Sequence, residues 1–193
     1  SEVRGAIERA ARAARSTDAP GRTPAAAQPA AEDAPLTRVT IASLPRTADV
    51  SIERDALMGI LQYGHVVDAA EIDAALALPM HHPALDAVRQ SIAAQPDRAR
   101  VGWASTAAES TREPYRSLAV ELLTASFPAL SEAEAVDSTR SLARRLRVRA
   151  VDREKTELLG AIQRLPAESE EGRAVRVKLR DLDAERRLLA EGL

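Results

Sequence analysis

Two apolar stripes, one on each side of a proline, constrain the fold of this chain more than any other feature. In each stripe the apolar side chains recur at alternating steps of three and four residues, which is the spacing of one helix face. The first stripe consists of Val148, Val151, Leu158, Ile162 and Leu165, and the second of Val175, Leu179, Leu182 and Leu189. Lys155 fills the one gap in the first stripe, and Arg186 fills the gap in the second. The pattern predicts two long helices that fold back on each other around Leu165-Pro166-Ala167-Glu168.

The ends of both helices carry their own signals. Ser131 and Glu134 have the spacing of a capping box, and Pro166 is a helix stop, so the first helix is expected from about Glu132 to Leu165. Ser169 is expected to cap the second helix, which would then run to about Ala190. The hairpin accordingly covers residues 131–193. The spacing leaves open whether the first helix is continuous near Arg149, and how the hairpin is oriented to the rest of the chain.

Residues 50–130 are expected to form a small helical bundle, because short amphipathic stretches alternate there with prolines that end or begin helices. These prolines are Pro79, Pro83, Pro96, Pro114 and Pro128. Ser51 is expected to cap the opening helix, with Glu53 in its first turn and Gly64 as a left-handed stop. No stretch alternates as a half-buried strand would. The predicted fold class is all-α, a small helical bundle followed by a long C-terminal helical hairpin.

The segment before the bundle has a different composition. Five of the eleven prolines lie between Thr17 and Asp49, among alanines, which predicts a Pro/Ala-rich linker over residues 17–49. Within it the run Val39–Leu44 has the composition of a packed arm, but the linker interpretation is preferred. Residues 1–16 carry a thin apolar stripe surrounded by arginines and are interpreted as the helical tail of an upstream domain. Because Ser1 is not a methionine, the chain is expected to be a piece of a longer protein.

Composition excludes several classes of function. The chain has no cysteine, so disulfides, zinc–cysteine sites and thiol catalysis are excluded. The formal net charge of −2 gives no global attraction to nucleic acid or acidic lipid. No apolar run approaches the ~20 residues that cross a bilayer, and the first residues lack the apolar core of a signal peptide. A cytoplasmic protein without membrane contact is expected.

No catalytic or metal site is predicted. The three histidines are His65, His81 and His82, and they are interpreted as exposed or helix-capping side chains, since no nearby carboxylates are spaced to complete a metal site. A glycine-rich phosphate loop and a dinucleotide fingerprint are both absent from the sequence. No cofactor is expected in this fragment.

The first hairpin helix contains a run of arginines without an intervening acid: Arg140, Arg144, Arg145, Arg147 and Arg149. Such a run is typical of a docking surface for an acidic peptide tail or a phosphate backbone. It is equally typical of a solvated helix face whose arginines pair with acids elsewhere in the fold. The second interpretation is preferred for most of the five, with one or two expected to contact a partner.

Near the C-terminal end of the second helix, Arg186 and Arg187 sit beside Leu188 and Leu189. Basic residues in the last turns complement the helix dipole, and an Arg–Leu cluster is also what a helix-in-groove contact uses. Both interpretations stay open. Since the stripe leucines hold the two helices together, the residues expected to remain for a partner are chiefly Arg187 and Leu188, with Arg186 as a charge in an apolar row.

The order of motifs over Ser51–Leu193 resembles the C-terminal helicase-binding domain of bacterial DNA primase (DnaG), of the actinobacterial type. The resemblance rests on Glu53–Tyr63, His82–Arg89, Leu118–Leu122, and, in the hairpin, Leu179-Arg180-Asp181-Leu182 and Glu185–Leu189. The family usually has proline after the Gln-Tyr of the first helix, where this chain has Gly64. The preceding linker resembles the tether that follows the primase polymerase core.

The resemblance implies a non-catalytic adaptor. Such domains dock onto the N-terminal domains of the replicative helicase, DnaB, and so place the primase core at the replication fork. The partner-binding residues are then expected among Arg180, Leu182, Arg186, Arg187, Leu188 and Leu189. Related domains also bind the acidic C-terminal tail of single-stranded DNA-binding protein through basic residues, a role that would fall to the arginine run. DNA contact is expected to be weak or indirect.

Two other functions fit parts of the pattern. The N-terminal domain of the replicative helicase resembles this primase domain, but it would be followed by a linker and an ATPase with a phosphate loop. A helical nucleic-acid-binding module would use the run from Arg140 to Arg149. The net acidity and the scarcity of aromatic residues for base stacking count against that module.

Overall fold

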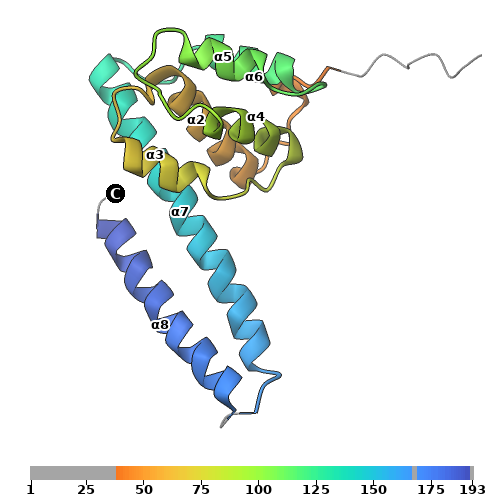
Figure 1. Cartoon of the computed structure of the whole chain (residues 1–193), viewed down its shortest axis with the longest axis vertical. Coiled ribbons are helices and arrows are strands. Elements are labelled where there is room, and N and C mark those ends of the chain that lie inside the picture. Colours follow the sequence, from red (N-terminus) through yellow and green to blue (C-terminus); the bar gives the residue numbers. More distant parts are fainter. Residues whose placement is uncertain (1–37, 167–168, 192–193) are drawn as a thin grey trace, which may run out of the picture. The chain divides into compact units, whose positions relative to one another are not determined.

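The computed structural model describes residues 38–166 and 169–191, and every regular element within these ranges is helical (Figure 1). The elements are a 3-10 turn η1 (Ile41–Ser43) and the α-helices α2 (Ala48–Tyr63), α3 (Ala69–Leu76), α4 (Pro83–Ala93), α5 (Trp103–Glu109), α6 (Arg116–Thr124), α7 (Glu132–Ile162) and α8 (Glu170–Glu191). The predicted all-α class is confirmed. The expected helical tail over 1–16 and most of the expected linker lie outside the described residues.

Residues 38–47, which were assigned to the linker, pack against the bundle instead. The Val39 N–H donates to the Pro114 carbonyl at 3.3 Å, and the Ile41 N–H donates to the Glu121 carboxylate at 2.7 Å. Leu44 is buried in the core. The arm interpretation of Val39–Leu44 is therefore the correct one, because its apolar residues gain burial and its backbone finds acceptors on the bundle.

The opening helix begins earlier than the sequence predicts. The hydroxyl of Thr47 accepts from the Val50 N–H at 3.3 Å, so Thr47 is the N-cap and Ser51 lies inside α2. The stop at the other end is also different, since Gly64 has φ −62° and is right-handed. A left-handed glycine appears at Gly102, with φ 79°, immediately before α5.

The core of the bundle is built around α2, which packs against α4, α6 and α7. Most of its fully buried large side chains are aliphatic, and they come from four helices: Leu57, Ile60 and Leu61 of α2, Ile72 of α3, Leu85 of α4, and Leu118 and Leu122 of α6. Burying each such side chain contributes ~1.5–3 kcal/mol. Among the aromatic residues only Trp103 is buried, and Tyr63 and Phe127 make an edge-on ring contact at 5.5 Å, so most of the core is packed from aliphatic side chains.

Helices α2 and α7 approach each other closely at Gly59. A Cβ at this position would lie 2.5 Å from the hydroxyl oxygen of Thr139, closer than real Cβ contacts occur. Thr139 is fully buried, and its hydroxyl donates to the Ala135 carbonyl one turn earlier at 2.8 Å. Small side chains on both helices thus let the two backbones come together.

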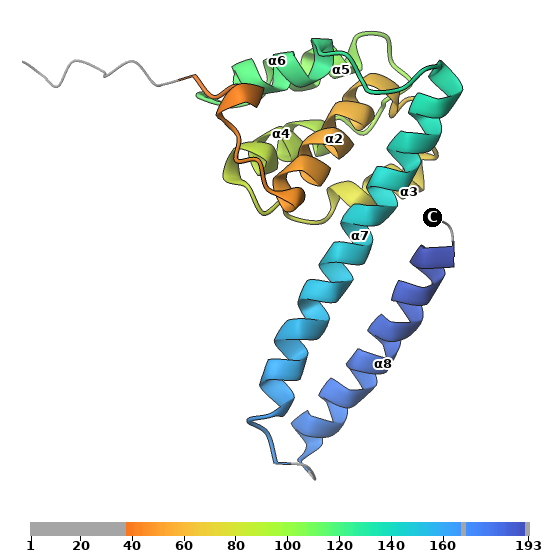
Figure 2. The same cartoon turned by 180° about the vertical axis from the view of Figure 1, so that it is seen from behind.

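Helix α7 belongs to both parts of the fold. Its first half carries Ala135, Thr139, Ala143 and Leu146 into the bundle, and its second half runs beside α8, as both views show (Figures 1 and 2). The helix is unbroken from Glu132 to Ile162, so it has no break near Arg149. It ends three residues before the predicted Leu165. Bundle and hairpin form one compact unit.

The caps of the hairpin follow the prediction in part. The Ser131 hydroxyl accepts from the Glu134 N–H at 3.2 Å, but the Glu134 carboxylate accepts from Leu130 N–H at 2.8 Å and not from Ser131. The second hydrogen bond of the capping box is therefore made to Leu130, one residue before the N-cap. Ser169 caps α8 as expected, since its hydroxyl accepts from the Gly172 N–H at 3.0 Å.

Candidate partner-binding surface

The predicted stripes meet along the hairpin and bury a thin apolar seam. Val151 of α7 and Leu182 and Leu189 of α8 are buried there, with Val148 and Leu158 packed against them. Leu182 and Leu189 were also predicted to contact a partner. Their exposed fractions of 3% and 7% do not fit that role, because the side chains are already covered by α7. The stripe leucines hold the hairpin together.

Ion pairs between α7 and α8 flank this seam. They are Arg147–Glu185 at 3.5 Å, Asp152–Arg186 at 2.7 Å, Glu154–Lys178 at 3.2 Å, and Lys155–Asp183. Lys155 and Arg186, the two residues that interrupt the stripes, are thus each paired with an acid on the opposite helix. Exposed pairs of this kind stabilise a fold by only ~0–1 kcal/mol each. Their positions nevertheless favour a single register of α8 on α7.

The pairing has an electrostatic consequence at Asp183. The hydrogen bond from Lys155, assisted by the nearby charges of Lys155, Arg187 and Arg186, holds the pKa of the Asp183 carboxyl below its usual value. The charged carboxylate is therefore the form that pairs with Lys155 of α7. Arg186 also forms the ion pair with Asp152 at 2.7 Å, so it is not a free anchor for a partner.

The side of α8 turned away from α7 carries a second stripe, hereafter the outer face of α8. It consists of Val177, Arg180, Ala184, Arg187 and Leu188, whose spacing puts them on one side of the helix. All five are exposed, including 71% of Leu188 and 47% of Val177. Within the described ranges neither Arg180 nor Arg187 has an ion pair; Arg187 donates to the Asp183 carbonyl at 3.2 Å, and its charge also acts on the Asp183 carboxyl. Of the six predicted contacts, Arg180, Arg187 and Leu188 remain available here.

Val177 and Ala184 were missed by the sequence analysis. Their signal was present in the sequence, because Val177, Arg180, Ala184 and Arg187 follow the same alternation of three and four as the inner stripe. The outer alternation mixes apolar and basic residues, so a search for apolar periodicity alone does not find it.

The arginine run of α7 is mostly occupied by structural ion pairs. Arg140 pairs with Asp137 at 2.7 Å and with Glu71 at 3.5 Å, and Arg144 donates to Glu71 at 3.0 Å. Arg147 pairs with Glu185 across the hairpin, and Arg149 pairs with Asp49 at the start of α2. The preferred interpretation of the run is confirmed for these four. Arg145 is exposed and finds no ion pair among residues 38–166 and 169–191.

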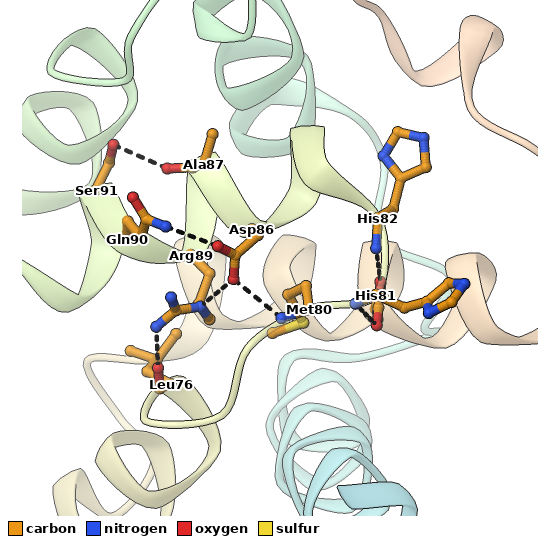
Figure 3. Close-up of polar contacts among 10 residues, drawn as sticks. Leu76, Met80, His81, His82, Asp86, Ala87, Arg89, Gln90 and Ser91 are labelled. Carbon is orange, nitrogen blue, oxygen red and sulfur yellow. Dashed lines mark hydrogen bonds and ion pairs between the residues drawn. The ribbon is translucent and has the colours of Figure 1, made fainter. Parts of the chain in front are cut away.

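Two carboxylates fix the loop between α3 and α4, close to the start of α7's hairpin half (Figure 3). Glu53 is buried and accepts from the backbone N–H groups of His81 and His82, the latter at 3.1 Å. Glu53 was predicted to lie in the first turn of the opening helix, where it would interact with the helix dipole. That prediction is wrong, because α2 begins at Ala48 and the Glu53 carboxylate binds the loop before α4 instead. His82 caps α4, since its Nδ1 accepts from the Ala84 N–H at 3.3 Å, which confirms the capping interpretation.

Asp86 is the second carboxylate of this loop. It accepts from Met80 N–H at 3.0 Å, Arg89 Nε at 2.7 Å and Gln90 Nε2 at 2.7 Å (Figure 3). Burial alone would raise the pKa of this carboxyl, but the bonds from Arg89, Met80 and Gln90 and the charge of Arg89 outweigh burial and lower it. Both acids are thus committed to structure. A residue pattern alone does not reveal such partners, which lie far along the chain for Glu53.

Across the described residues, no group of three or more His, Asp or Glu side chains is placed to hold a metal ion. Among their helices none is both long and apolar enough to span a membrane. What the surface does offer is one helix face with apolar and basic side chains, an arrangement suited to binding a protein with an apolar groove and acidic edges.

Comparison with known proteins bears on the fold. A solved structure of the helicase-binding domain of primase from Mycobacterium tuberculosis matches with a TM-score of 0.54, covering 74% of this chain and 91% of that chain. The two sequences are 20% identical. The likeness establishes the fold. No protein-family model and no curated protein matches the chain.

Proposed function

We propose that this chain is the helicase-binding domain of a bacterial DNA primase. It would dock the primase onto the N-terminal domains of the replicative helicase, DnaB, and so direct RNA primer synthesis to the replication fork. The observation that carries the proposal is the likeness in fold to the mycobacterial domain, of which 91% is covered. In this proposal the domain itself has no catalytic activity, the polymerase centre belongs to another part of the primase, and the protein acts in the cytoplasm.

We propose the outer face of α8 as the docking surface. Its exposed Leu188 and Val177 supply apolar contact area, and Arg180 and Arg187 supply charge without breaking an ion pair of the fold. Arginine is among the residues that most often carry the binding energy of a protein interface, and the exposed apolar side chains beside it add contact area. The inner leucines contribute by keeping α8 against α7, so that the outer face is presented as a rigid helix.

The test is a titration of the hexameric helicase with the full chain and its variants. The double substitution R180E/R187E is expected to weaken binding by about tenfold or more, and Leu188→Ser by a smaller factor. The matched control is Arg46→Glu, which reverses an exposed arginine before α2 that has no ion pair in the described ranges. If R46E weakened binding as much as R180E/R187E, general charge rather than the outer face would be responsible.

Truncation near Ser131 is a poor test of the hairpin. It would remove Ala135, Thr139, Ala143 and Leu146 from the bundle core as well as the hairpin. Loss of binding by such a fragment would report unfolding. Point substitutions on exposed positions avoid this difficulty.

The acidic tail of single-stranded DNA-binding protein is a second partner that the resemblance implies. The ion pairs of Arg140, Arg147 and Arg149 do not favour the α7 run as its docking surface. Within that run we propose a contact only at Arg145. The same pairing, together with the net charge of −2, speaks against the alternative of a nucleic-acid-binding module.

A further inference from the structure

A cleft between the end of α2, the turn before α5, α5 itself and α6 is lined by basic side chains and by no carboxylate of the described residues. It has a volume of about 520 Å³. The charged or titratable side chains in its lining are His65, Arg98 and Arg100. The chain as a whole has more acids than lysines and arginines, 29 against 27. The basic bias is therefore local, and it favours an anionic ligand.

Arg98 is the buried cation of this cleft. Its side chain is 6% exposed, and its Nη2 donates to the Asp73 carboxylate at 2.6 Å. Its Nε is buried as well and has no acceptor among the residues that the structure describes. Buried donors of native proteins nearly always have a partner, so a donor left over in this way calls for a water molecule or a ligand.

Two further donor side chains lie at the same cleft. Arg100 is exposed and has no ion pair in the part of the chain that the structure describes. Ser105 is exposed too, and its hydroxyl makes no hydrogen bond to residues 38–166 or 169–191. A phosphate group presents three acceptor oxygens and a carboxylate two, and a guanidinium can bind a phosphate through two donors at once. Two arginines and a hydroxyl therefore suit a phosphate group better than a carboxylate.

The rest of the lining is mostly apolar. Leu61 of α2, Ala104 of α5 and Leu123 of α6 form a wall, and Val101 is 98% exposed beside Arg100. An apolar wall with a few polar groups at one place, in a volume of about 300–1,000 Å³, is the common form of a small-molecule site. The ligand expected here is a phosphate group joined to a body that can lie against aliphatic side chains.

We propose that this cleft binds a mononucleotide, with the phosphate on Arg98, Arg100 and Ser105 and the base against the apolar wall. A strand of nucleic acid is the weaker source of the same phosphate chemistry. Sites for single strands stack successive bases on exposed rings, and Trp103, the aromatic residue of this cleft, is only 6% exposed.

The lining predicts little discrimination between bases. Gln62 is the side-chain amide of the cleft, and its Nε2 already donates to the carbonyls of Leu122 and Ala125, at 2.8 and 2.9 Å. Because that donor is occupied, the phosphate rather than the base edge is expected to set the affinity. No residue of α7 or α8 lines the cleft, so the proposal does not depend on helicase docking.

The test is calorimetric titration of the full chain with AMP, adenosine and inorganic phosphate, each alone. Saturable binding of AMP is expected, with weaker binding of phosphate and none of adenosine. Arg100→Glu should weaken AMP binding about tenfold or more, because it reverses the charge at an exposed position. Arg98→Lys keeps the charge but loses the planar pair of donors, and should weaken binding about threefold or more.

The matched control is Arg164→Glu, which reverses an exposed arginine near the hairpin turn that has no ion pair within the described ranges. Equal weakening by R164E and R100E would overturn the proposal, because AMP would then sense general charge. Absence of saturable AMP binding, or equal binding of adenosine, would overturn it too. A single-stranded oligonucleotide that bound more tightly than AMP, with the same loss in R100E, would overturn it in favour of a nucleic-acid strand. Helicase binding by R100E should equal that of the wild type.

Discussion

The half of α7 inside the bundle and the half inside the hairpin are held by different chemistry. In the bundle, Thr139 and Ala143 are buried against several helices, and the contact with α2 is so close that Gly59 has no room for a side chain. In the hairpin, α7 shares with α8 a thin seam of three buried residues within the described ranges, flanked by exposed ion pairs. Stability should therefore reside in the bundle, while the hairpin is a presented and more easily opened element.

Truncating one buried leucine to alanine, in the bundle or in the hairpin, should show the difference in stability between the two regions with the largest effect. Leu122→Ala in the bundle is expected to lower the free energy of unfolding by about 2–5 kcal/mol, because it leaves a cavity at a fully buried position. Leu182→Ala in the seam should leave the main thermal transition near that of the wild type. It should instead speed hydrogen exchange in α8, because only α7 covers that side chain.

Calorimetry and hydrogen exchange measured on the same samples check both expectations. Equal shifts of the main transition in the two variants would mean that bundle and hairpin unfold as one cooperative unit. The distinction between a stable bundle and an easily opened hairpin would then be wrong.

A pair of glycine substitutions tests the same difference between bundle and hairpin with a smaller change in stability. Gly59→Ala should destabilise the protein by about 1–3 kcal/mol, since its Cβ would fall 2.5 Å from the Thr139 hydroxyl. Gly160→Ala, in the hairpin half of α7, has nothing within 4 Å and should stabilise helix α7 by up to about 1 kcal/mol. Urea unfolding of both variants measures whether the free energy of unfolding falls for Gly59→Ala and rises for Gly160→Ala. A stabilising Gly59→Ala would show that α2 and α7 can separate without loss.

The sequence predicted the elements of the hairpin better than their surroundings. The inner stripe, the end of α7 before Pro166 and the cap at Ser169 follow from local spacing, and the structure has all three. Residues 167 and 168 of the predicted turn lie outside the described residues. The start of α2 was missed because Ser51 and Thr47 are both good caps, and the choice between them depends on how residues 38–47 pack against α6. The sequence around residue 47 does not predict that contact with α6.

The candidate site could be predicted only in part for the same reason. Periodicity identifies that Leu182 and Leu189 belong to a stripe, yet it does not say whether the stripe faces a neighbour in the chain or a partner. The pairing of Arg144 with Glu71, or of Arg149 with Asp49, joins residues far apart in the sequence. Such pairs decide which arginines stay available, and they become visible only when the helices are in place.

Asp86 in the bundle and Asp183 in the hairpin allow a comparison with smaller expected effects. Both carboxyls have a lowered pKa, but their surroundings differ. A carboxyl whose pKa is lower in the folded state contributes stability above the unfolded value, 3.8 for aspartate, and loses it as the pH falls through the folded value. Asp86 is half-buried in the bundle and Asp183 is exposed on the hairpin. Asp86→Asn should therefore lower the melting temperature at neutral pH and flatten the acid limb of its pH profile, in low and in high salt.

Asp183→Asn should act on the hairpin alone, and less at high salt than at low salt, because an exposed ion pair contributes little and weakens as salt is added. Hydrogen exchange in α8 should rise in D183N above pH 4 and approach the wild type as the pH falls or salt is added. The sign follows from the lowered pKa of Asp183, since the charged form is the one that pairs with Lys155 on the opposite helix. An effect of D183N that persisted in high salt would show that the Lys155 pair is a strong, desolvated contact, and the hairpin would then resemble the bundle more than its exposure suggests.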